Sequence, residues 1–290
     1  MLFGKKLTWN PDGQHIYVTG GSTGLGLSLA ILLVKSGAHV SIVARNQNKL
    51  DDALKELENH RQHPNQKLAA HSFSLDTAEE SAAALEAVCK PHDGRAPDAV
   101  FACAGSSKPK FFVEMSAEEM QNGMTNGYWV QAWTAMAAAK KMVRDRTKGK
   151  IILVSSTLGY MSFVGYASYS PAKHALRGLA DTLQSELMLY DIDVHIFFPP
   201  TMYTPGYEEE TKTKPKITRD IESTDDGVTA EAAAVALFEG VAPRHNIFLD
   251  PLYDMAAYII APIWKRSVDK RVREHRAEHR EYLSEAGFFS

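Results

Sequence analysis

The sequence predicts a doubly wound parallel α/β sheet with helices on both faces. Short apolar runs bounded by turn signals alternate with helical segments of about 10–15 residues, which is typical of βαβ units. A glycine-rich turn also follows the first apolar run directly. Because βαβ crossovers are right-handed, we expect helices to cover both faces of the sheet.

The expected elements follow in order along the chain. Residues 15–19 (HIYVT) predict the first strand, and residues 25–36 predict the first helix, which Gly37 closes. Later runs predict strands at 39–44, 68–75, 99–102, 151–154, 194–198 and 246–249, with helices at 50–60 and 78–89. A further helix begins near residue 169 and carries a regular stripe of alanine and leucine.

Composition excludes several classes of protein. The 290 residues are 44% hydrophobic and 23% charged, which is ordinary for a soluble globular chain with a large core. Cys89 and Cys103 are too few for a disulfide scaffold. A formal net charge of −3 argues against a nucleic-acid-binding protein. We expect no metal site, because no HExxH or CxxC spacing occurs.

A phosphate-binding turn is expected after the first strand, where residues 19–26 read TGGSTGLG. Glycines there permit positive φ and close approach of a ligand, and the N-terminus of the following helix favours a pyrophosphate. The alternative is a tight turn without a ligand. The expected contacts of the dinucleotide are Gly20, Ser22, Thr23, Gly24, Leu25 and Gly26.

The residue that follows the second strand indicates which dinucleotide binds. Dinucleotide folds usually place an acidic residue here, whereas this chain has Arg45 followed by Asn46. An arginine pairs with a 2′-phosphate, so we expect NADP(H); the alternative is a solvated arginine. If Arg45 does not bind the phosphate, Ser22 or Lys49 would. Asp76 is a candidate contact for the adenine and fits a helix cap equally well.

A possible reaction centre follows the strand at 151–154. Tyr169 and Lys173 are four residues apart and therefore share one helix face. A phenol has an ordinary pKa near 10, and a nearby ammonium group lowers it. Ser156 is positioned to hydrogen-bond a carbonyl oxygen that becomes an alkoxide.

Together these motifs resemble those of the short-chain dehydrogenase/reductase family, over about residues 14–249. The resemblance implies a Rossmann-type fold and a ketone reductase. It also implies that Ser156 orients the carbonyl, that Tyr169 is the general acid, and that Lys173 lowers the pKa of Tyr169 and holds the nicotinamide ribose. Asn126 occupies the position of the residue that organises a proton-relay water.

The resemblance extends to later positions, with two departures. Cys103 precedes Ala104 and Gly105 where the family has Asn-Ala-Gly, and a second proline follows Pro199 where the family has glycine. Ala104, Gly105 and Pro199 are expected cofactor contacts. Thr204 is expected to contact the nicotinamide carboxamide.

Within the family, residues 166–170, 174–180, 197–200 and 204–207 are similar to the branch that reduces 3-ketodihydrosphingosine to sphinganine with NADPH. This implies a long-chain keto sphingoid base as the substrate, and the family suggests a homodimer or homotetramer. The alternatives are another lipid or steroid carbonyl reductase, or an NADP-binding regulatory protein without turnover. The aromatic and apolar residues expected to line a substrate pocket are Phe111, Phe112, Tyr160, Met161 and Phe163.

We expect one NADP-binding reductase domain over residues 1–250. Residues 208–226 contain 11 charged side chains among 19, which fits a solvated insertion or a lid. In the extension at 251–290, the predicted contact segment is 251–264, in which an uncharged apolar run at 255–264 precedes a basic stretch. That run is too short to span a bilayer, so we expect contact with a membrane surface, with a packing element as the alternative. By resemblance, the membrane is the cytosolic face of the endoplasmic reticulum.

Overall fold

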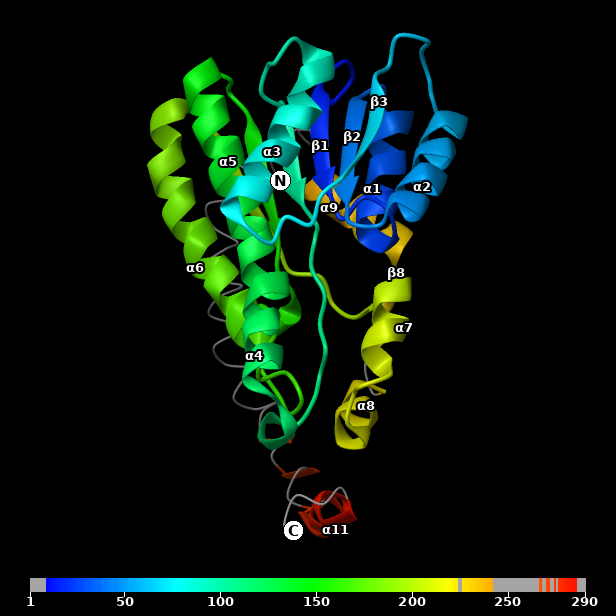
Figure 1. The fold of residues 1–290 in the computed structure, drawn as a ribbon, viewed down its shortest axis with the longest axis vertical. Helices are drawn as coiled ribbons and strands as arrows, with labels where there is room; N and C mark the ends of the chain where they lie inside the picture. Colours follow the sequence, from blue (N-terminus) through cyan, green and yellow to red (C-terminus); the bar gives the residue numbers. More distant parts are fainter. Residues whose placement is uncertain are drawn as a thin grey trace, which may run out of the picture.

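A computed structural model describes residues 9–223, 226–241, 266–267, 270–271, 274 and 276–285. Its centre is a six-stranded parallel sheet in the order β3-β2-β1-β4-β5-β6 (Figure 1). The strands are β1 (His15–Thr19), β2 (His39–Ala44), β3 (Leu68–Ser72), β4 (Ala99–Ala102), β5 (Lys150–Val154) and β6 (Asp193–Phe197). The doubly wound parallel sheet predicted from the sequence is confirmed.

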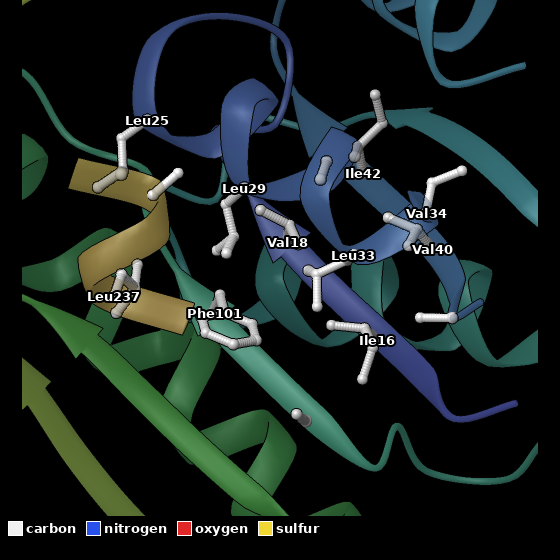
Figure 2. Close-up of a cluster of buried hydrophobic side chains, with 14 of the residues drawn as sticks. Ile16, Val18, Leu25, Leu29, Leu33, Val34, Val40, Ile42, Phe101 and Leu237 are labelled. Atoms are coloured by element: carbon white, nitrogen blue, oxygen red, sulfur yellow. The ribbon is translucent and has the colours of Figure 1, made fainter. Parts of the chain in front are cut away.

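Two helical layers cover the sheet. One face packs against α1 (Gly24–Lys35), α2 (Gln47–Asn59) and α9 (Ala230–Gly240). The other packs against α3 (Ala78–Cys89), α5 (Val130–Asp145) and α6 (Ser170–Leu187). Within β1, Ile16 and Val18 face the first layer while Tyr17 faces the second, because side chains alternate along a strand. Figure 2 shows the first core, where Leu29 and Leu33 of α1 pack over β1.

The boundaries of several elements differ from those predicted. The second helix begins at Gln47 rather than residue 50, because Asn46 caps it by accepting a hydrogen bond from the Lys49 N–H. The third strand ends at Ser72 rather than residue 75, because Ser72 pairs with Ala44, where β2 ends. The strand expected at 246–249 lies outside the described residues.

The order of the strands positions the site. The order reverses between β1 and β4, and parallel α/β sheets bind ligands beyond the carboxyl ends of the strands at such a switch point. Figure 1 shows α4 (Ala117–Met124) on one side beyond that edge, with α7 (Pro205–Thr211) and α8 (Lys216–Glu222) on the other. A two-stranded sheet of β7 (Met202–Tyr203) and β8 (Val228–Thr229) joins the two ends of the segment that contains α7 and α8.

The charged segment at 208–226 is more than a solvated loop in this structure. The side chain of Lys214 is fully buried and forms ion pairs with Glu210 and Glu222.

Farther along the chain, α11 (Arg276–Glu285) contacts both sides of the site. Glu278 pairs with Lys216 at 2.5 Å, and the Tyr282 ring lies 6.2 Å from that of Phe111. No helix within the described residues is long and apolar enough to cross a membrane.

Candidate active site

A cleft of about 850 Å³ opens at the carboxyl edge of the sheet. The ends of β1, β2, β4, β5 and β6 line it together with α7 and α8. The structure brings the following residues selected from the sequence into its wall: Gly20, Ser22, Thr23, Gly24, Leu25, Gly26, Arg45, Asn46, Lys49, Ala104, Gly105, Asn126, Ser156, Tyr169, Lys173, Pro199 and Thr204. Residues far apart in the sequence therefore share one cavity.

The glycine-rich turn has the geometry of a phosphate cradle. Gly20 and Gly24 have φ values of 66° and 54°, in the left-handed region that favours glycine. A Cβ on Gly26 would lie 2.3 Å from the Gly20 carbonyl oxygen, so only glycine permits this close packing. The first turn of α1 contains no acidic side chain. Its free N–H groups are therefore available to a dinucleotide pyrophosphate, which fits this cradle.

Positive side chains lie at the end of β2. Arg45 and Lys49 are exposed and line the cleft. Within the described ranges, neither Arg45 nor Lys49 forms an ion pair with a carboxylate, although the exposed Glu209 lies close enough to Lys49 for their charges to interact. Both cations can therefore face a phosphate in the cleft. The Asn46 side chain is already engaged, because its oxygen accepts from the Lys49 N–H at 3.0 Å.

Asp76 is the one predicted cofactor contact that the structure does not place in the cleft. Its side chain is exposed beside the cavity, whereas Phe73, Ser74 and Leu75 line the wall. The backbone turns at Leu75, where φ is 64°, and this turn carries Asp76 out of the wall. The helix cap considered for Asp76 is supplied by Thr77, whose hydroxyl accepts from the Glu80 N–H.

Ser156, Tyr169 and Lys173 meet at the ends of β5 and α6. The Ser156 side chain hydrogen-bonds with Tyr169 and accepts from the Leu158 N–H at 3.2 Å. Lys173 is buried, lies 5.4 Å from the centre of the Tyr169 ring, and donates from Nζ to the Val154 carbonyl oxygen at 2.9 Å. The three side chains thus form one contiguous group on the cleft wall.

The protonation of this group differs from the expectation. Burial raises the pKa of Tyr169, and the nearby Glu210 carboxylate raises it further, while the hydrogen bond with Ser156 lowers it. Burial lowers the pKa of Lys173 to about 7. The expected lowering of the Tyr169 pKa by Lys173 is therefore not seen in this structure, because the lysine itself is desolvated. The phenol remains protonated at neutral pH, as a proton donor must be.

Asn126 lies in a π-helical turn, Thr125–Trp129, between α4 and α5. Such turns are rare and are frequent at functional sites. The Asn126 side chain donates to the Asn122 carbonyl oxygen at 2.9 Å. A Cβ on Gly105 would lie 3.1 Å from the Asn126 carbonyl oxygen and 3.8 Å from Lys173 Nζ. The turn therefore brings the Asn126 backbone close to the reaction centre.

The departure at Cys103 leaves the adjoining backbone well ordered. The Ala104 N–H donates to the Thr19 hydroxyl at 3.0 Å, which ties the end of β4 to β1. Burial raises the pKa of Cys103 to about 12, so the thiol is neutral. It packs as a small apolar side chain against the core of the first layer.

Gln131 of α5 is a residue that the sequence analysis missed. It is buried, donates to the Val154 carbonyl oxygen at 2.9 Å and to that of Ala104 at 3.3 Å, and accepts from the Val154 N–H at 2.9 Å. Gln131 therefore joins the ends of β4 and β5 beneath Lys173. A lone glutamine in a helix gives no sequence signal of this role.

A second missed group joins α7 and α8 to Tyr166, in the segment that precedes α6. The Tyr166 hydroxyl donates to Glu210 at 2.6 Å and also contacts Glu222. Lys214 Nζ lies 3.0 Å from Glu210 and 2.5 Å from Glu222, and 4.4 Å from the centre of the Tyr207 ring. Both glutamates and Tyr166 line the cleft. We call the two glutamates the Glu210–Glu222 pair.

An apolar groove of about 370 Å³ adjoins the cleft. Its wall includes Phe111, Phe112, Val113, Phe163, Val164 and Tyr166, of which Phe163 and Tyr166 also line the cleft. Among the expected pocket residues, Met161 lines the cleft and Tyr160 lines neither cavity, because its ring packs 4.1 Å from that of Phe198. The cleft and the groove are therefore neighbours that share part of one wall.

The fold and site together define a dinucleotide-binding oxidoreductase. A family model described as short chain dehydrogenase matches residues 14–215. The chain belongs to the short-chain dehydrogenase family, as its motifs indicated. It is thus an oxidoreductase that acts on a ketone or the corresponding secondary alcohol, and it binds a nicotinamide cofactor.

Relatives in sequence carry consistent names. A Cryptococcus neoformans protein named 3-ketodihydrosphingosine reductase is 41% identical over 308 residues, covering 98% of this chain and 92% of that protein. A Danio rerio protein named 3-dehydrosphinganine reductase is 36% identical and covers 73% of this chain and 64% of its own length. The Mus musculus protein named 3-ketodihydrosphingosine reductase is also 36% identical, with coverages of 73% and 63%.

Solved structures agree on the fold. A short-chain dehydrogenase/reductase from Mycobacterium ulcerans superposes with a TM-score of 0.70 and 25% identity, covering 79% of this chain and 84% of that one. A Mycobacterium marinum structure of the same type gives a TM-score of 0.72 at 21% identity, with coverages of 80% and 89%. The second likeness concerns the fold alone.

Proposed function

We propose that this protein reduces a long-chain 3-keto sphingoid base, 3-ketodihydrosphingosine, to sphinganine with NADPH. The observation that carries the proposal is that an apolar groove adjoins the cleft that holds Tyr169 and shares Phe163 and Tyr166 with its wall. A polar reaction centre beside an apolar groove suits a ketone on a long alkyl chain. The names of relatives that match nearly the whole chain support the same substrate.

The proposed chemistry assigns one role to each side chain. When bound, the cofactor supplies a hydride to the carbonyl carbon of the ketone. Tyr169 donates its phenolic proton to the carbonyl oxygen, and the raised pKa of the phenol keeps that proton in place at neutral pH. Ser156 hydrogen-bonds the same oxygen as negative charge develops on it.

Lys173 and Asn126 support this group. Lys173 holds the ribose of the nicotinamide in the proposed complex, and its present partner, the Val154 carbonyl oxygen, fixes the ammonium beside Tyr169. Asn126 organises a water molecule that returns a proton to the phenol.

The choice of NADPH over NADH rests on charge. Arg45 directly after β2 and Lys49 in the first turn of α2 line the cleft without an acidic side chain between them, so a 2′-phosphate meets attraction rather than repulsion. Ser22 on the glycine-rich turn lines the same part of the wall and can donate a hydrogen bond to that phosphate.

The proposal also includes the place of action. A substrate with a long alkyl chain resides in a membrane, so we propose that the protein works at a membrane surface, the cytosolic face of the endoplasmic reticulum. The segment at 251–264, predicted as the contact, lies outside the described residues. A homodimer or homotetramer stays a prediction; the stacked rings of Trp129 and Trp133, 4.6 Å apart, suit packing against a second copy.

A substrate panel tests the proposed function. The purified full chain is given NADPH with the long-chain 3-keto sphingoid base, with a steroid ketone, or with no ketone, and NADPH oxidation is followed. Mass spectrometry identifies the product. We expect sphinganine from the sphingoid base and far slower turnover of the steroid. Faster turnover of the steroid would contradict the proposed substrate, and no turnover of either ketone would contradict a catalytic role.

A further inference from the structure

Charge is unevenly distributed around the cleft. Arg45 and Lys49 stand where the end of β2 meets the phosphate cradle. The Glu210–Glu222 pair stands on the wall that α7 and α8 form. One part of the cleft is therefore suited to phosphate, and another part is suited to a cation.

The Glu210–Glu222 pair is not neutralised by its neighbours. Lys214 supplies one positive charge for two carboxylates, and among the described residues no other cation forms an ion pair with either one. Burial lowers the pKa of Lys214, but the two carboxylates outweigh burial and raise it, so the lysine is charged. The group thus keeps one excess negative charge.

The hydrogen bonds of the Glu210–Glu222 pair are also incomplete. The Tyr166 hydroxyl lies within reach of both carboxylates, yet a phenol has a single proton to donate. One of the two carboxylates therefore lacks this donor at any moment. The side chains of Glu222 and Glu210 are only 8% and 18% exposed, so water replaces the missing donor poorly. A buried carboxylate without a full set of partners is costly, and a bound cation removes that cost.

The pair lies next to the reaction centre. The Tyr166 ring is 5.9 Å from the Tyr169 ring, and the Glu210 charge is close enough to raise the pKa of Tyr169. A second polar atom of the cleft also lacks a partner: the Ser107 hydroxyl is buried and unbonded among the described residues. An unpartnered buried hydroxyl in the same cavity points independently to a polar ligand.

We propose that the Glu210–Glu222 pair binds the ammonium group of the substrate and thereby selects 2-amino ketones. This inference rests on the proposed function, because a 3-keto sphingoid base carries an ammonium on the carbon next to its ketone. With the ketone oxygen at Ser156 and Tyr169, the ammonium nitrogen lies two bonds from the reacting carbon. The excess negative charge is balanced when the substrate binds.

A pair of matched ketones tests the proposal. One is a long-chain 2-amino-1-hydroxy-3-ketone, and the other is the same ketone without the amino group. For the unchanged protein we expect kcat/KM to favour the amino ketone. In Glu210→Gln this preference is expected to fall by about 10- to 100-fold, the range of one charge-assisted hydrogen bond. The ratio is the informative quantity, because the effect of Glu210 on the Tyr169 pKa acts on both ketones and cancels.

The matched control is Glu209→Gln. Glu209 is the preceding residue of α7, is exposed, and pairs with Lys212 at 2.5 Å outside the cleft wall. Its substitution is expected to leave the preference unchanged. Circular dichroism and NADPH binding check that each variant folds.

A measurement on the unchanged protein keeps the proposal testable if Glu210→Gln does not fold. A long-chain primary amine and the alcohol of equal length are compared as competitive inhibitors. We expect the amine to bind at least about tenfold more tightly, from the same charge-assisted contact.

The outcomes separate this proposal from the proposed function. An equal loss of kcat/KM on both ketones in Glu210→Gln, or equal inhibition by amine and alcohol, would show that the pair only fastens α7 to α8. In either case the ketone reductase itself would stand. If the unchanged protein reduces neither ketone, the proposed function is overturned and this inference with it.

Discussion

Lys173 and Gln131 donate to the same acceptor, the Val154 carbonyl oxygen, each at 2.9 Å. Gln131 also accepts from the Val154 N–H, so it fixes both polar groups of that peptide position. The lysine therefore depends on a carbonyl that a buried glutamine from α5 holds in place. Burial keeps the Lys173 pKa at about 7, and this value has consequences for stability.

We expect Lys173→Met to stabilise the fold at neutral and acidic pH. The pKa of Lys173 is about 7 in the folded chain and near 10.4 when unfolded, so the unfolded state binds more protons between these values. The buried lysine thus costs stability below pH 7, and this cost fades as the pH rises to about 10. Thermal unfolding of both proteins across this pH range measures the difference.

We expect Lys173→Met to reduce activity, although it stabilises the fold. The methionine keeps the apolar stem but cannot hold the ribose, so both NADPH affinity and kcat are expected to fall. The Val154 carbonyl keeps its bond from Gln131, so it is not left unpaired. A stability gain that does not depend on pH would mean that Lys173 has the same pKa in the folded and unfolded states, and it would contradict the lowering of that pKa by burial.

Gln131→Leu should reduce both stability and turnover. It leaves the Val154 N–H buried without an acceptor, at a cost of about 1–3 kcal/mol, and it frees the end of β5 that positions Lys173. Thr134→Val is the matched control, because Thr134 is buried in the same helix and donates only to the Val130 carbonyl oxygen. The control is expected to lose stability with kcat nearly unchanged. Equal kcat in the two variants at matched folded fraction would remove the positioning role from Gln131.

Tyr169→Phe should reduce kcat by about 100-fold or more, the range of a general acid, while NADPH binding stays near that of the unchanged protein. Only the phenolic oxygen and its hydrogen bond with Ser156 are lost. Tyr160→Phe serves as the control, because Tyr160 lines neither cavity. Stopped-flow measurement of NADPH oxidation and fluorescence titration of the cofactor separate the two effects. Substantial turnover in Tyr169→Phe would exclude the phenol as the proton donor.

Arg45→Asp should shift preference from NADPH toward NADH. Replacing attraction with repulsion at the 2′-phosphate is expected to raise the Kd for NADPH by about one to two decades. Lys55→Asp makes the same change of sign on α2, where Lys55 is exposed and pairs with Asp52 outside the cleft. An unchanged NADPH/NADH ratio in Arg45→Asp would transfer the phosphate contact to Ser22 or Lys49.

Local patterns made much of this fold predictable. The glycine turn at 19–26 can be predicted from the sequence because positive φ at Gly20 and Gly24 favours that residue type. The alternation of apolar strand segments with helical segments along the sequence predicts the doubly wound sheet. Tyr169 and Lys173 share a face because they are four residues apart on one helix, so sequence spacing alone places them together.

Other parts of the site depend on packing between distant elements. Lys214 lies in a segment with the composition of a solvated loop, yet it is buried because Glu210 and Glu222 approach it from α7 and α8. Gln131 gains its role only because α5 packs beneath the end of β5. The pKa of Tyr169 rises because the fold desolvates it, an effect that the spacing of Lys173 does not reveal.

The groove should determine preference for chain length. Phe112 and Val113 are 65% and 51% exposed on its wall, so Phe112→Ser with Val113→Ser removes apolar surface without opening the core. We expect KM for a long-chain ketone to rise by about tenfold or more, since each buried CH₂ contributes about 0.8 kcal/mol, while KM for a short-chain ketone changes little. Leu189→Ser, at an 81% exposed position after α6 and away from both cavities, is the control. The measurement is a series of ketones of increasing length. A parallel rise of KM at every length would mean that the alkyl chain leaves the cleft by another route.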